Sequence, residues 1–419
     1  MRMPLTTSLL SRVAVGIRSN RREYIPPAGY LNQVTPQYAE AWFPTKGCFW
    51  DAMGHCTTCN YGVSVEVSPD QMVRAAEIAV DSLAPSTRTL WISAFDTLHD
   101  REVPPATRRE IFAVLARSPV DTILTEAHPA SVRSEKVQEC VELLDGRTFG
   151  IQLGVETMDE FIRYACVNKP YSNTLLARAV DVIHDSDAVA YANLIAGIPF
   201  LTEREVVAQT ALSVRQAISI GFDQIVLFPN HVKEHTIAFA LAESNRYSPP
   251  DLWTIRDVLA AVSDLVSEIH LAWLDLKPHP GAAEVSFEPS RVSTKRLYDL
   301  LNQFDHSRSY EPLQEAFDLI RPHTQECTET SLKSRLLDGY QWLARTFGHD
   351  HWWVENEDKI AVEIQQGLSR SSVDHSTESL PETDVLPTRP GRVVEDLALN
   401  IVDSASVPVP DLTKGGANG

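Results

Sequence analysis

The chain has 419 residues, of which 43% are hydrophobic and 22% are charged, as is usual for a globular protein. This composition excludes collagen-like, disulfide-rich and fully disordered chains, and no apolar run reaches the roughly 18 residues that a transmembrane helix needs. Asp and Glu number 56 against 37 Lys and Arg, which gives a formal net charge of −19 at pH 7. So acidic a chain should not hold nucleic acid through its overall field, although a local basic groove or a basic partner subunit could do so.

The cysteine content predicts a reducing compartment. Six cysteines in a chain of this length do not make a disulfide scaffold. The first 19 residues include three arginines, but no long apolar core or cleavage site of the kind found in signal peptides. We therefore expect a cytoplasmic protein without a membrane partner.

The hydrophobic pattern predicts alternating strands and helices. Residues 1–35 show no clear period and are interpreted as an N-terminal extension. Beyond them, short apolar runs alternate with amphipathic stretches, which predicts an α/β core with a parallel sheet, open or closed into a barrel. In such sheets the functional residues follow the carboxyl ends of the strands. The expected strands are 46–49, 89–94, 122–125, 149–155, 188–195, 224–227 and 272–276, and the expected helices are 69–82, 105–117, 132–144, 172–184, 203–218 and 250–269.

The last third of the chain has a different character. Residues 288–368 are expected to be helical, with helices at 295–304, 312–320 and 331–347. From residue 369 onward the composition shifts to Ser, Pro, Thr, Asp and Gly, which predicts a disordered acidic tail. The predicted organisation is an extension over 1–35, a core over 36–287, a helical region over 288–368 and a tail over 369–419.

The segment that carries chemistry reads GCFWDAMGHCTTCNYG at residues 47–62. It places Cys48, Cys56 and Cys59 in one loop with the spacing Cys-x7-Cys-x2-Cys. Three thiolates can hold three irons of a four-iron, four-sulfur cluster, which leaves the fourth iron free to bind a chelating ligand. Glycines within the segment permit the tight turns that such a loop requires.

A structural zinc site is the main alternative, because His55 could supply the fourth ligand beside the three cysteines. However, no second Cys-x-x-Cys or His pair follows at zinc-finger spacing. An iron–sulfur cluster is therefore the leading hypothesis. A zinc-stabilised interaction module and three unrelated thiols remain the alternatives.

The cysteine loop and the strand–helix repeats that follow it resemble the radical SAM superfamily. The spacing of the cysteines resembles the branch that contains the Elongator catalytic subunit and the radical SAM subunit of archaeosine synthase. Later segments, in the same order along the chain, favour the archaeosine synthase subunit: SAF at 93–95, REVPP at 101–105, LGVET at 153–157 with NK at 168–169, GIPFLTE at 197–203, and FPNHV at 228–232 with YSPPDLW at 247–253.

This resemblance implies a partial (β/α)6 TIM-like barrel with a helical C-terminal extension, and one [4Fe-4S] cluster held by Cys48, Cys56 and Cys59. It also implies that the open iron binds S-adenosylmethionine (SAM) through its amino and carboxylate groups. An electron from a donor such as flavodoxin or ferredoxin would then release a 5′-deoxyadenosyl radical that abstracts hydrogen from a substrate. We expect no second cluster.

Several residues at predicted strand ends are candidates for binding SAM. The carboxylate of Glu156 could pair with the SAM ammonium group, or with a neighbouring cation such as Arg163. Asn168 and Lys169 could contact SAM or simply cap a loop. The backbone at Gly197 and Pro199 could approach SAM closely or form an ordinary strand-to-helix turn. The remaining candidates are two pairs: Phe49 and Tyr61, which flank the cysteines and could shield the cluster or only pack, and Ser93 and Phe95, which end a strand facing the cleft.

The chain departs from the family pattern at two places that bear on the substrate. The family tends to show Glu-Ser-Arg-Pro after the third strand, whereas residues 126–129 read EAHP here. Residues 277–281 read KPHPG, without the cysteine that the archaeosine-type subunit carries in a similar segment. With the acidic net charge, these departures favour a small-molecule biosynthetic intermediate as substrate. The alternative is a tRNA- or nucleoside-modifying subunit that cleaves the C–N bond of a lysine adduct and works with a partner.

Overall fold

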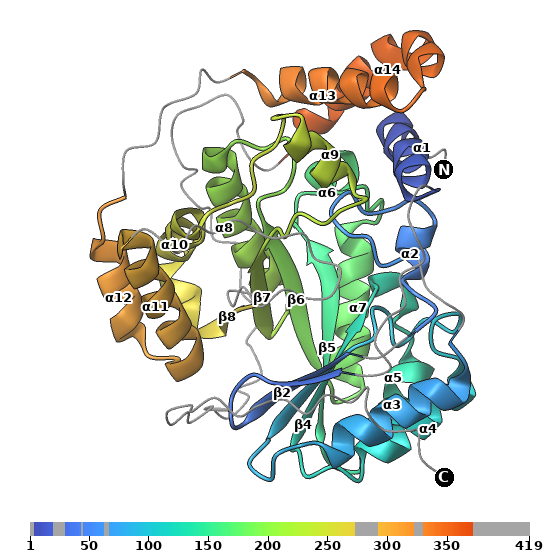
Figure 1. Ribbon diagram of the computed structural model, residues 1–419, viewed down its shortest axis with the longest axis vertical. Coiled ribbons are helices and arrows are strands. Elements are labelled where there is room, and N and C mark those ends of the chain that lie inside the picture. Colours follow the sequence, from blue (N-terminus) through green and yellow to red (C-terminus); the bar gives the residue numbers. More distant parts are fainter. Residues whose placement is uncertain are drawn as a thin grey trace, which may run out of the picture.

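The computed structural model describes residues 4–19, 30–42, 45–62, 67–272, 292–321 and 330–371 (Figure 1). Eight strands form one sheet in the order of the chain. β1 is antiparallel to β2, and every later neighbouring pair is parallel. The strands are β1 (Tyr30–Gln33), β2 (Tyr38–Trp42), β3 (Thr89–Ser93), β4 (Thr122–Ala127), β5 (Thr148–Glu156), β6 (Val189–Ala196), β7 (Gln224–Pro229) and β8 (Ile269–Leu271).

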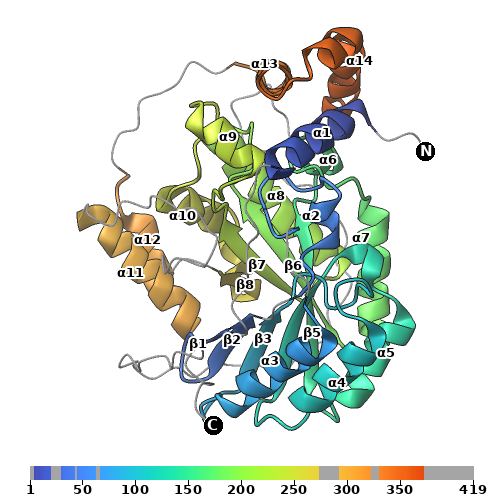
Figure 2. The same ribbon diagram turned by 45° about the vertical axis from the view of Figure 1, so that its right-hand side comes forward.

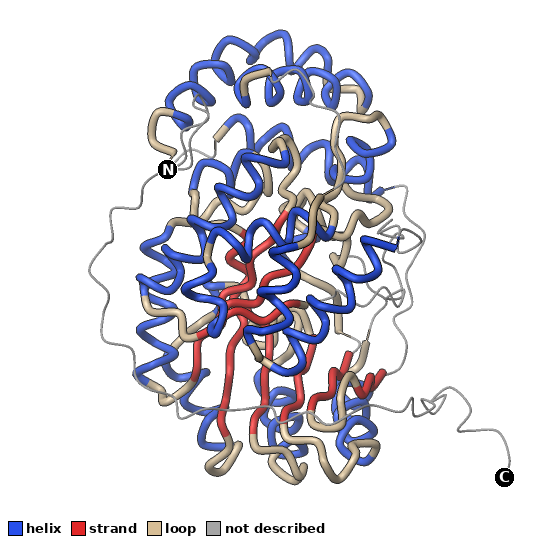
Figure 3. Tube along the Cα trace, turned by 90° about the vertical axis from the view of Figure 1, so that its left-hand side faces the viewer, coloured by secondary structure: helices blue, strands red, loops and turns tan. Residues whose placement is uncertain are grey.

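A helix follows each of the strands β2 to β7 and covers the outside of the curled sheet (Figures 2 and 3). These six helices are α3 (Pro69–Asp81), α4 (Pro105–Leu115), α5 (Ser134–Leu143), α7 (Asn173–Asp185), α8 (Glu203–Ile220) and α10 (Leu252–Ala261). The six β/α units confirm the predicted partial barrel. The other helices are α1 (Leu5–Ser19), α2 (Phe49–Ala52), α6 (Glu160–Ala165), α9 (Ile237–Glu243), α11 (Val292–Ser307), α12 (Tyr310–Asp318), α13 (Leu332–Thr346) and α14 (Asp350–Leu368), with 3-10 turns at Pro129–Ser131 and Ser263–Glu268.

The two faces of the sheet differ in polarity. Successive side chains of a strand point to opposite faces, so one set packs under the helices and the other lines the inside of the curl. The helix-covered set is apolar and includes Leu90, Ile92, Ile123, Ile151, Leu153, Ala190, Ala192, Ile225 and Leu227. The strand register aligns a second, more polar set on the inner face: Glu40, Trp91, Ser93, Leu124, Glu126, Gln152, Tyr191, Asn193 and Val226.

The N-terminal part of the chain is more structured than the sequence predicts. The expected strand at 46–49 is wrong, because Gly47 turns the backbone at a φ of +80° and Cys48 then caps helix α2. The first strand of the parallel sheet is β2, whose small residues Ala39 and Ala41 are fully buried. Residues 1–35, interpreted from the sequence as an N-terminal extension, contain α1 and β1.

The other strand predictions at 89–94, 122–125, 149–155, 188–195 and 224–227 are confirmed to within two residues at each end. The expected helix at 250–269 ends early, because a 3-10 turn and β8 occupy its last residues. In the region expected to be helical, α14 is an additional helix. Residues 273–291 and 372–419, which contain most of the expected strand 272–276, the 277–281 segment and almost all of the predicted tail, lie outside the described residues.

Helix α1 packs with the C-terminal helices over one end of the barrel (Figure 2). Its buried side chains recur at helical spacing and join a core formed with α6, α9, α13 and α14. The α1 members of that core are Leu9, Leu10, Val13, Ala14 and Ile17. Within the described part of the chain, no helix has the length and hydropathy needed to cross a membrane.

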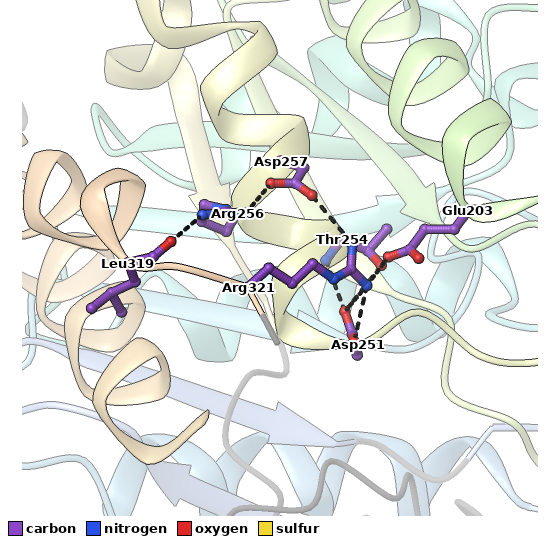
Figure 4. Close-up of polar contacts among 7 residues, drawn as sticks. All are labelled: Glu203, Asp251, Thr254, Arg256, Asp257, Leu319 and Arg321. Carbon is purple, nitrogen blue, oxygen red and sulfur yellow. Dashed lines mark hydrogen bonds and ion pairs between the residues drawn. The ribbon is translucent and has the colours of Figure 1, made fainter. Parts of the chain in front are cut away.

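A group of ion pairs ties the segment after α12 to α8 and α10 (Figure 4). Arg321 pairs with Glu203 at the start of α8, and with Asp251 at 3.2 Å and Asp257 at 3.4 Å on α10. Arg256 on α10 also donates to the carbonyl of Leu319 at 2.9 Å. These contacts fix α11 and α12 beside the last β/α unit.

We predict that Gly367→Ala destabilises the docking of α14. A Cβ at Gly367 would overlap the ring of Phe161 on α6, and such overpacking costs about 1–3 kcal/mol of unfolding free energy. The measurement is urea denaturation followed by circular dichroism. The matched control is Gly16→Ala on α1, where a Cβ meets nothing within 4 Å and better helix propensity should add about 0.5–1 kcal/mol. Equal stability changes in the two variants would contradict the close packing of α14 on α6.

Candidate active site

The cysteine loop follows β2, the first strand of the parallel sheet, and leads through α2 towards α3. Cys48 caps the start of α2, Cys56 is buried in a left-handed conformation with a φ of +68°, and Cys59 is half-buried. The loop is closed at its ends, because the amide of Cys48 donates to the carbonyl of Tyr61 at 2.8 Å. The fold therefore presents all three predicted ligands from one closed loop.

The thiols of this loop differ in acidity. A hydrogen bond with the Cys56 thiol lowers the pKa of Cys59 to about 6; burial opposes this shift, and Lys169 and Lys233 assist it. The same hydrogen bond raises the pKa of Cys56, and burial raises the pKa of Cys48. Two cations near the thiols favour thiolates, which are the form that binds metal.

Neighbouring loops hold the cysteine loop in place. Thr57 donates its amide to the carbonyl of Val167 at 3.0 Å, and its own carbonyl accepts from the amide of Ala238 at 2.9 Å. The side-chain amide of Asn60 donates to the carbonyl of Glu234 at 2.8 Å. The loop is thus bonded to the segments that follow α6 and β7.

A buried acidic pair supports the loop from the side of β3. The amide of Phe49 donates to Glu102 at 2.6 Å, and the other oxygen of Glu102 accepts from the amide of Asp96 at 3.1 Å. The Asp96 carboxylate accepts from Ser131 at 2.6 Å and from the indole of Trp50. Burial raises the pKa of Asp96 to about 7 and that of Glu102 well above its ordinary value.

Glu156 ends β5 in a left-handed conformation with a φ of +63° and is buried. Its Oε1 forms an ion pair with Lys169, whereas Oε2 has no hydrogen-bond partner. Burial would lower the pKa of Lys169, but Glu156 and the nearby thiols raise it well above its ordinary value. Arg163, the alternative partner expected from the sequence, instead donates to the carbonyls of Thr157 and Tyr171, each at 2.9 Å.

Asn168 contacts the cysteine loop directly. Its side-chain amide donates to the carbonyl of Gly54 at 2.9 Å and to Ser11 on α1 at 3.1 Å. The backbone carbonyl of Asn168 lies 3.2 Å from Nδ1 of His55, the residue considered as a fourth zinc ligand. The same carbonyl accepts from the amide of Cys56 at 3.5 Å. Asn168 thus connects α1 to the cysteine loop.

The aromatic candidates stack on other rings at the edge of the site. Tyr61 stacks on Phe95 with centroids 4.7 Å apart, and the Lys233 ammonium lies 4.6 Å from the Tyr61 ring. Phe49 stacks on His99 at 4.5 Å. These contacts bring Phe95 to the cysteine loop together with Lys233, which the sequence analysis did not single out.

Gly197 and Pro199 lie at the exit of β6. Gly197 has a φ of +90°, and a Cβ there would overlap the ring of Pro250, so close packing explains this glycine. Its carbonyl accepts from Asn230 at 3.1 Å and from Tyr247, and Asn230 donates to Tyr247 at 2.8 Å. Pro199 is buried. Asn230 and Tyr247 were missed as functional candidates, although both lie in segments that carry the family resemblance.

The donor set fits a three-thiolate cluster. Three thiols come from one closed loop beside two buried lysines, and Glu156 offers a buried carboxylate oxygen without a partner. Among the residues that the structure describes, no three His, Cys, Asp or Glu side chains converge closely enough to hold a single metal ion.

The buried carboxyl of Glu126 should make the free energy of unfolding depend on pH. Burial raises its pKa to about 7, so the folded state binds this proton more tightly than the unfolded state does. The resulting stabilisation is complete below about pH 4.5 and is lost as the pH rises through 7. Glu126→Gln keeps an acceptor for Ser93, which donates at 2.8 Å, but carries no charge. We expect its melting temperature to exceed that of the wild type by about 2–4 °C at pH 8 and to converge with it near pH 5.

This comparison is made on the metal-free protein by scanning calorimetry between pH 5 and 8. Glu110→Gln, on the exposed face of α4, is the matched control and should give a difference that does not change with pH. If the difference in melting temperature between Glu126→Gln and the wild type were also independent of pH, the burial of an uncharged carboxyl at this position would be contradicted.

No family model matches the chain, but curated proteins of related sequence exist. One is an uncharacterised protein of Methanocaldococcus jannaschii, 25% identical over 52% of this chain and 62% of that protein. Two others are named archaeosine synthase subunit beta. The subunit of Methanosarcina acetivorans is 27% identical over 55% of this chain and 68% of its own length, and that of Thermococcus kodakarensis is 26% identical over 52% and 69%. Nearly half of this chain lies outside these matches.

Solved structures also resemble the chain, and the three described below each have a TM-score under 0.5. The Elp3 protein of Methanocaldococcus infernus has a TM-score of 0.39 and 15% identity, over 49% of this chain and 54% of its own. Methylornithine synthase, PylB, has a TM-score of 0.42 and 12% identity, over 72% and 90%. HemN of Escherichia coli, a radical SAM enzyme, has a TM-score of 0.37 and 14% identity, over 68% and 61%. Because these scores lie below 0.5, the fold assignment rests on the strand order and β/α units described above.

The expected resemblance to the archaeosine synthase subunit agrees with the sequence relatives. The two relatives named archaeosine synthase subunit beta match the branch that the cysteine spacing and the later co-linear segments indicated. The predicted resemblance is therefore confirmed: the chain is similar to the radical SAM branch that contains the archaeosine synthase subunit.

Proposed function

We propose that the chain is a radical SAM enzyme that holds one [4Fe-4S] cluster on Cys48, Cys56 and Cys59. The observation that carries this proposal is the closed loop that presents these three thiols after the first parallel strand, beside Lys169 and Lys233. Three thiolates are the donor set of a four-iron cluster with one open iron, and with SAM bound this group supplies a 5′-deoxyadenosyl radical that abstracts hydrogen from a substrate. Because reductive cleavage consumes one electron, a donor such as flavodoxin or ferredoxin is required.

Glu156 would bind the ammonium group of SAM. Its Oε2 is buried without a hydrogen-bond partner, and such an oxygen is costly unless a donor reaches it. A cationic donor would give a charge-assisted hydrogen bond in a site largely closed to water. Lys169 pairs with the other oxygen of Glu156, and its positive charge acts to lower the pKa of the Cys56 and Cys59 thiols.

The aromatic residues would limit the access of water to the loop. Tyr61 and Phe95 stack beside the cysteines, and the ammonium group of Lys233 lies against the ring of Tyr61. Exclusion of water protects a reactive radical from side reactions. Contacts of SAM with Phe49, Ser93, Asn168, Gly197 and Pro199 remain predictions from the family resemblance.

The substrate that we propose is a small molecule bound against the inner face of the sheet. That face carries Glu126, Gln152 and Asn193 on neighbouring strands, and the Oδ1 atom of Asn193 is buried without a partner. These carboxyl and amide groups could form hydrogen bonds with a small polar ligand. The net charge of −19 and the sequence departures at 126–129 and 277–281 support the same assignment.

A second candidate function is favoured by the names of the relatives. Two of them are archaeosine synthase subunits, so this chain could modify a nucleoside or tRNA together with a basic partner subunit. Such a partner would supply the phosphate contacts that an acidic chain lacks. A zinc-stabilised interaction module is the remaining alternative, and the metal content of the purified protein distinguishes it from both enzymes.

Substitution of any one loop cysteine should abolish SAM cleavage. Cys48→Ala, Cys56→Ala and Cys59→Ala each remove a thiolate from the three-ligand set, and we expect no 5′-deoxyadenosine above background after anaerobic reconstitution with iron, sulfide, dithionite and SAM. Cys140→Ala is the matched control, because that thiol is buried on α5, where burial raises its pKa to about 12. Full 5′-deoxyadenosine formation by any of the three loop variants would refute the ligand assignment.

A small-molecule substrate predicts that this chain has no affinity of its own for tRNA. If the substrate is a small molecule, an electrophoretic mobility shift with bulk tRNA should show no complex up to about 100 μM protein, at the weak end of ordinary non-specific binding. The gel is run at low and physiological salt, with a basic nucleic-acid-binding protein as positive control. A saturable complex of this chain alone at physiological salt would contradict the small-molecule assignment.

A further inference from the structure

The last turn of α1 reaches into the cysteine loop through one side chain, Arg18, which is only 8% exposed. Its Nη2 donates to the carbonyl of Cys56 at 2.9 Å, to that of His55 at 3.0 Å and to that of Cys59 at 3.3 Å. Its Nη1 donates to the carbonyl of Asp51. One guanidinium therefore gathers four carbonyls of the loop, two of which belong to cysteines.

Arg18 also forms a buried ion pair with the side chain of Asp51, which is fully buried. The other carboxylate oxygen of Asp51 accepts from the amide of Gly62, at the far end of the loop. Arg18 and Asp51 thus connect the beginning, middle and end of the cysteine segment. A buried pair of this kind strongly destabilises its surroundings when one partner is removed.

Helix α1 is itself fixed at both ends. At its start, the amides of Leu5 and Thr6 donate to Glu363 of α14 at 2.7 Å and 3.1 Å, so a carboxylate satisfies its free amides and stabilises the positive end of its dipole. Along its length it lies directly on the loop, since a Cβ at Gly54 would come within 2.8 Å of the carbonyl of Ser11. The C-terminal helix therefore supports the helix that carries Arg18.

Arg18 makes these contacts through two of its nitrogens, since Nη2 meets the carbonyls of His55, Cys56 and Cys59 and Nη1 meets that of Asp51. The guanidinium has five donors in a rigid plane, and it keeps its charge under all ordinary conditions. A lysine ammonium has three donors around a single point, so it could replace the Nη2 contacts but not, at the same time, the separate Nη1 contact with Asp51. Holding the carbonyls of Cys56 and Cys59 fixes a peptide plane beside each residue, and this limits the directions in which the two thiols can point.

We propose that Arg18 is a positioning residue for the cluster, which holds the cysteine loop in its ligand-ready conformation before any iron is bound. This inference rests on the proposed function. It assigns a role to α1, which no sequence motif indicated, and it makes the C-terminal helix α14 an indirect support of the iron site through Glu363.

The test compares the full-length wild type with Arg18→Ala, Arg18→Lys and Arg12→Ala after anaerobic reconstitution. Arg12 is an exposed residue of the same helix that lies over the ring of Trp352, so its removal changes the charge of α1 without touching the loop. Iron and sulfide per chain are measured first, then the rate of iron loss to a chelator, and then the electron paramagnetic resonance spectrum of the reduced protein. Loss of an outer support of a metal site typically costs about 10–100-fold in metal affinity.

We expect Arg18→Ala to lose iron about 10–100-fold faster than the wild type, with a broadened spectrum, and Arg18→Lys to fall between the two because it restores the charge but not all of the contacts. Arg12→Ala should match the wild type. A folded Arg18→Ala or Arg18→Lys protein with wild-type iron loss and spectrum would overturn the positioning role and leave the proposed function intact. If Arg18→Ala does not fold, Arg18→Lys decides the question by the same criterion. A wild-type chain that takes up no cluster would overturn the proposed function, and this inference with it.

Discussion

The site depends on how an irregular loop satisfies its backbone hydrogen bonds. Residues 45–62 contain one short helix, α2, so most of their amides and carbonyls have no partner within regular structure. The surrounding elements provide those partners: Arg18 from α1, Glu102 from the loop after β3, Val167 from the segment after α6, and Ala238 from α9. Because these elements are far apart in sequence, the loop can take this conformation only when the barrel and both terminal helices are in place.

Charged side chains lie close to the cysteine loop at the carboxyl ends of the strands. Glu156 and Lys169 form a buried pair next to the thiols, and a second lysine, Lys233, lies over Tyr61. Deeper in the curl, Glu126 lies beside Ser93, and burial raises the pKa of its carboxyl to about 7. The cations lie near the groups that the proposed function needs as thiolates, and the acceptor groups lie where a substrate would enter.

Much of the barrel could be predicted because it depends on local patterns. The strands at 89–94, 149–155 and 224–227 are short apolar runs between amphipathic helices, and the structure has them within two residues of the expected bounds. The cysteine motif identified the loop because its spacing is a property of the chain itself. The first parallel strand was missed because β2 is only five residues long, with Glu40 at its centre, and because the strand was assigned instead to residues 46–49, directly at the cysteine motif.

The contacts that organise the site could not be predicted, because they join distant parts of the chain. Nothing in the sequence around Arg18 indicates that its guanidinium meets carbonyls more than thirty residues away. The pairing of Glu156 with Lys169 rather than with Arg163 follows from the left-handed turn at the end of β5, where the strand register shifts. The close packing at Gly197 could not be predicted either, because the fold brings the ring of Pro250, which is distant in sequence, against it.

The proposed function requires that the three thiols hold a four-iron cluster whose open iron binds SAM. Electron paramagnetic resonance of the dithionite-reduced, reconstituted protein, recorded with and without SAM, examines both requirements at once. We predict the signal of a reduced [4Fe-4S] cluster, with g values that shift when SAM is added. A protein that contains zinc in place of iron, or a cluster signal that SAM leaves unchanged, would contradict this assignment.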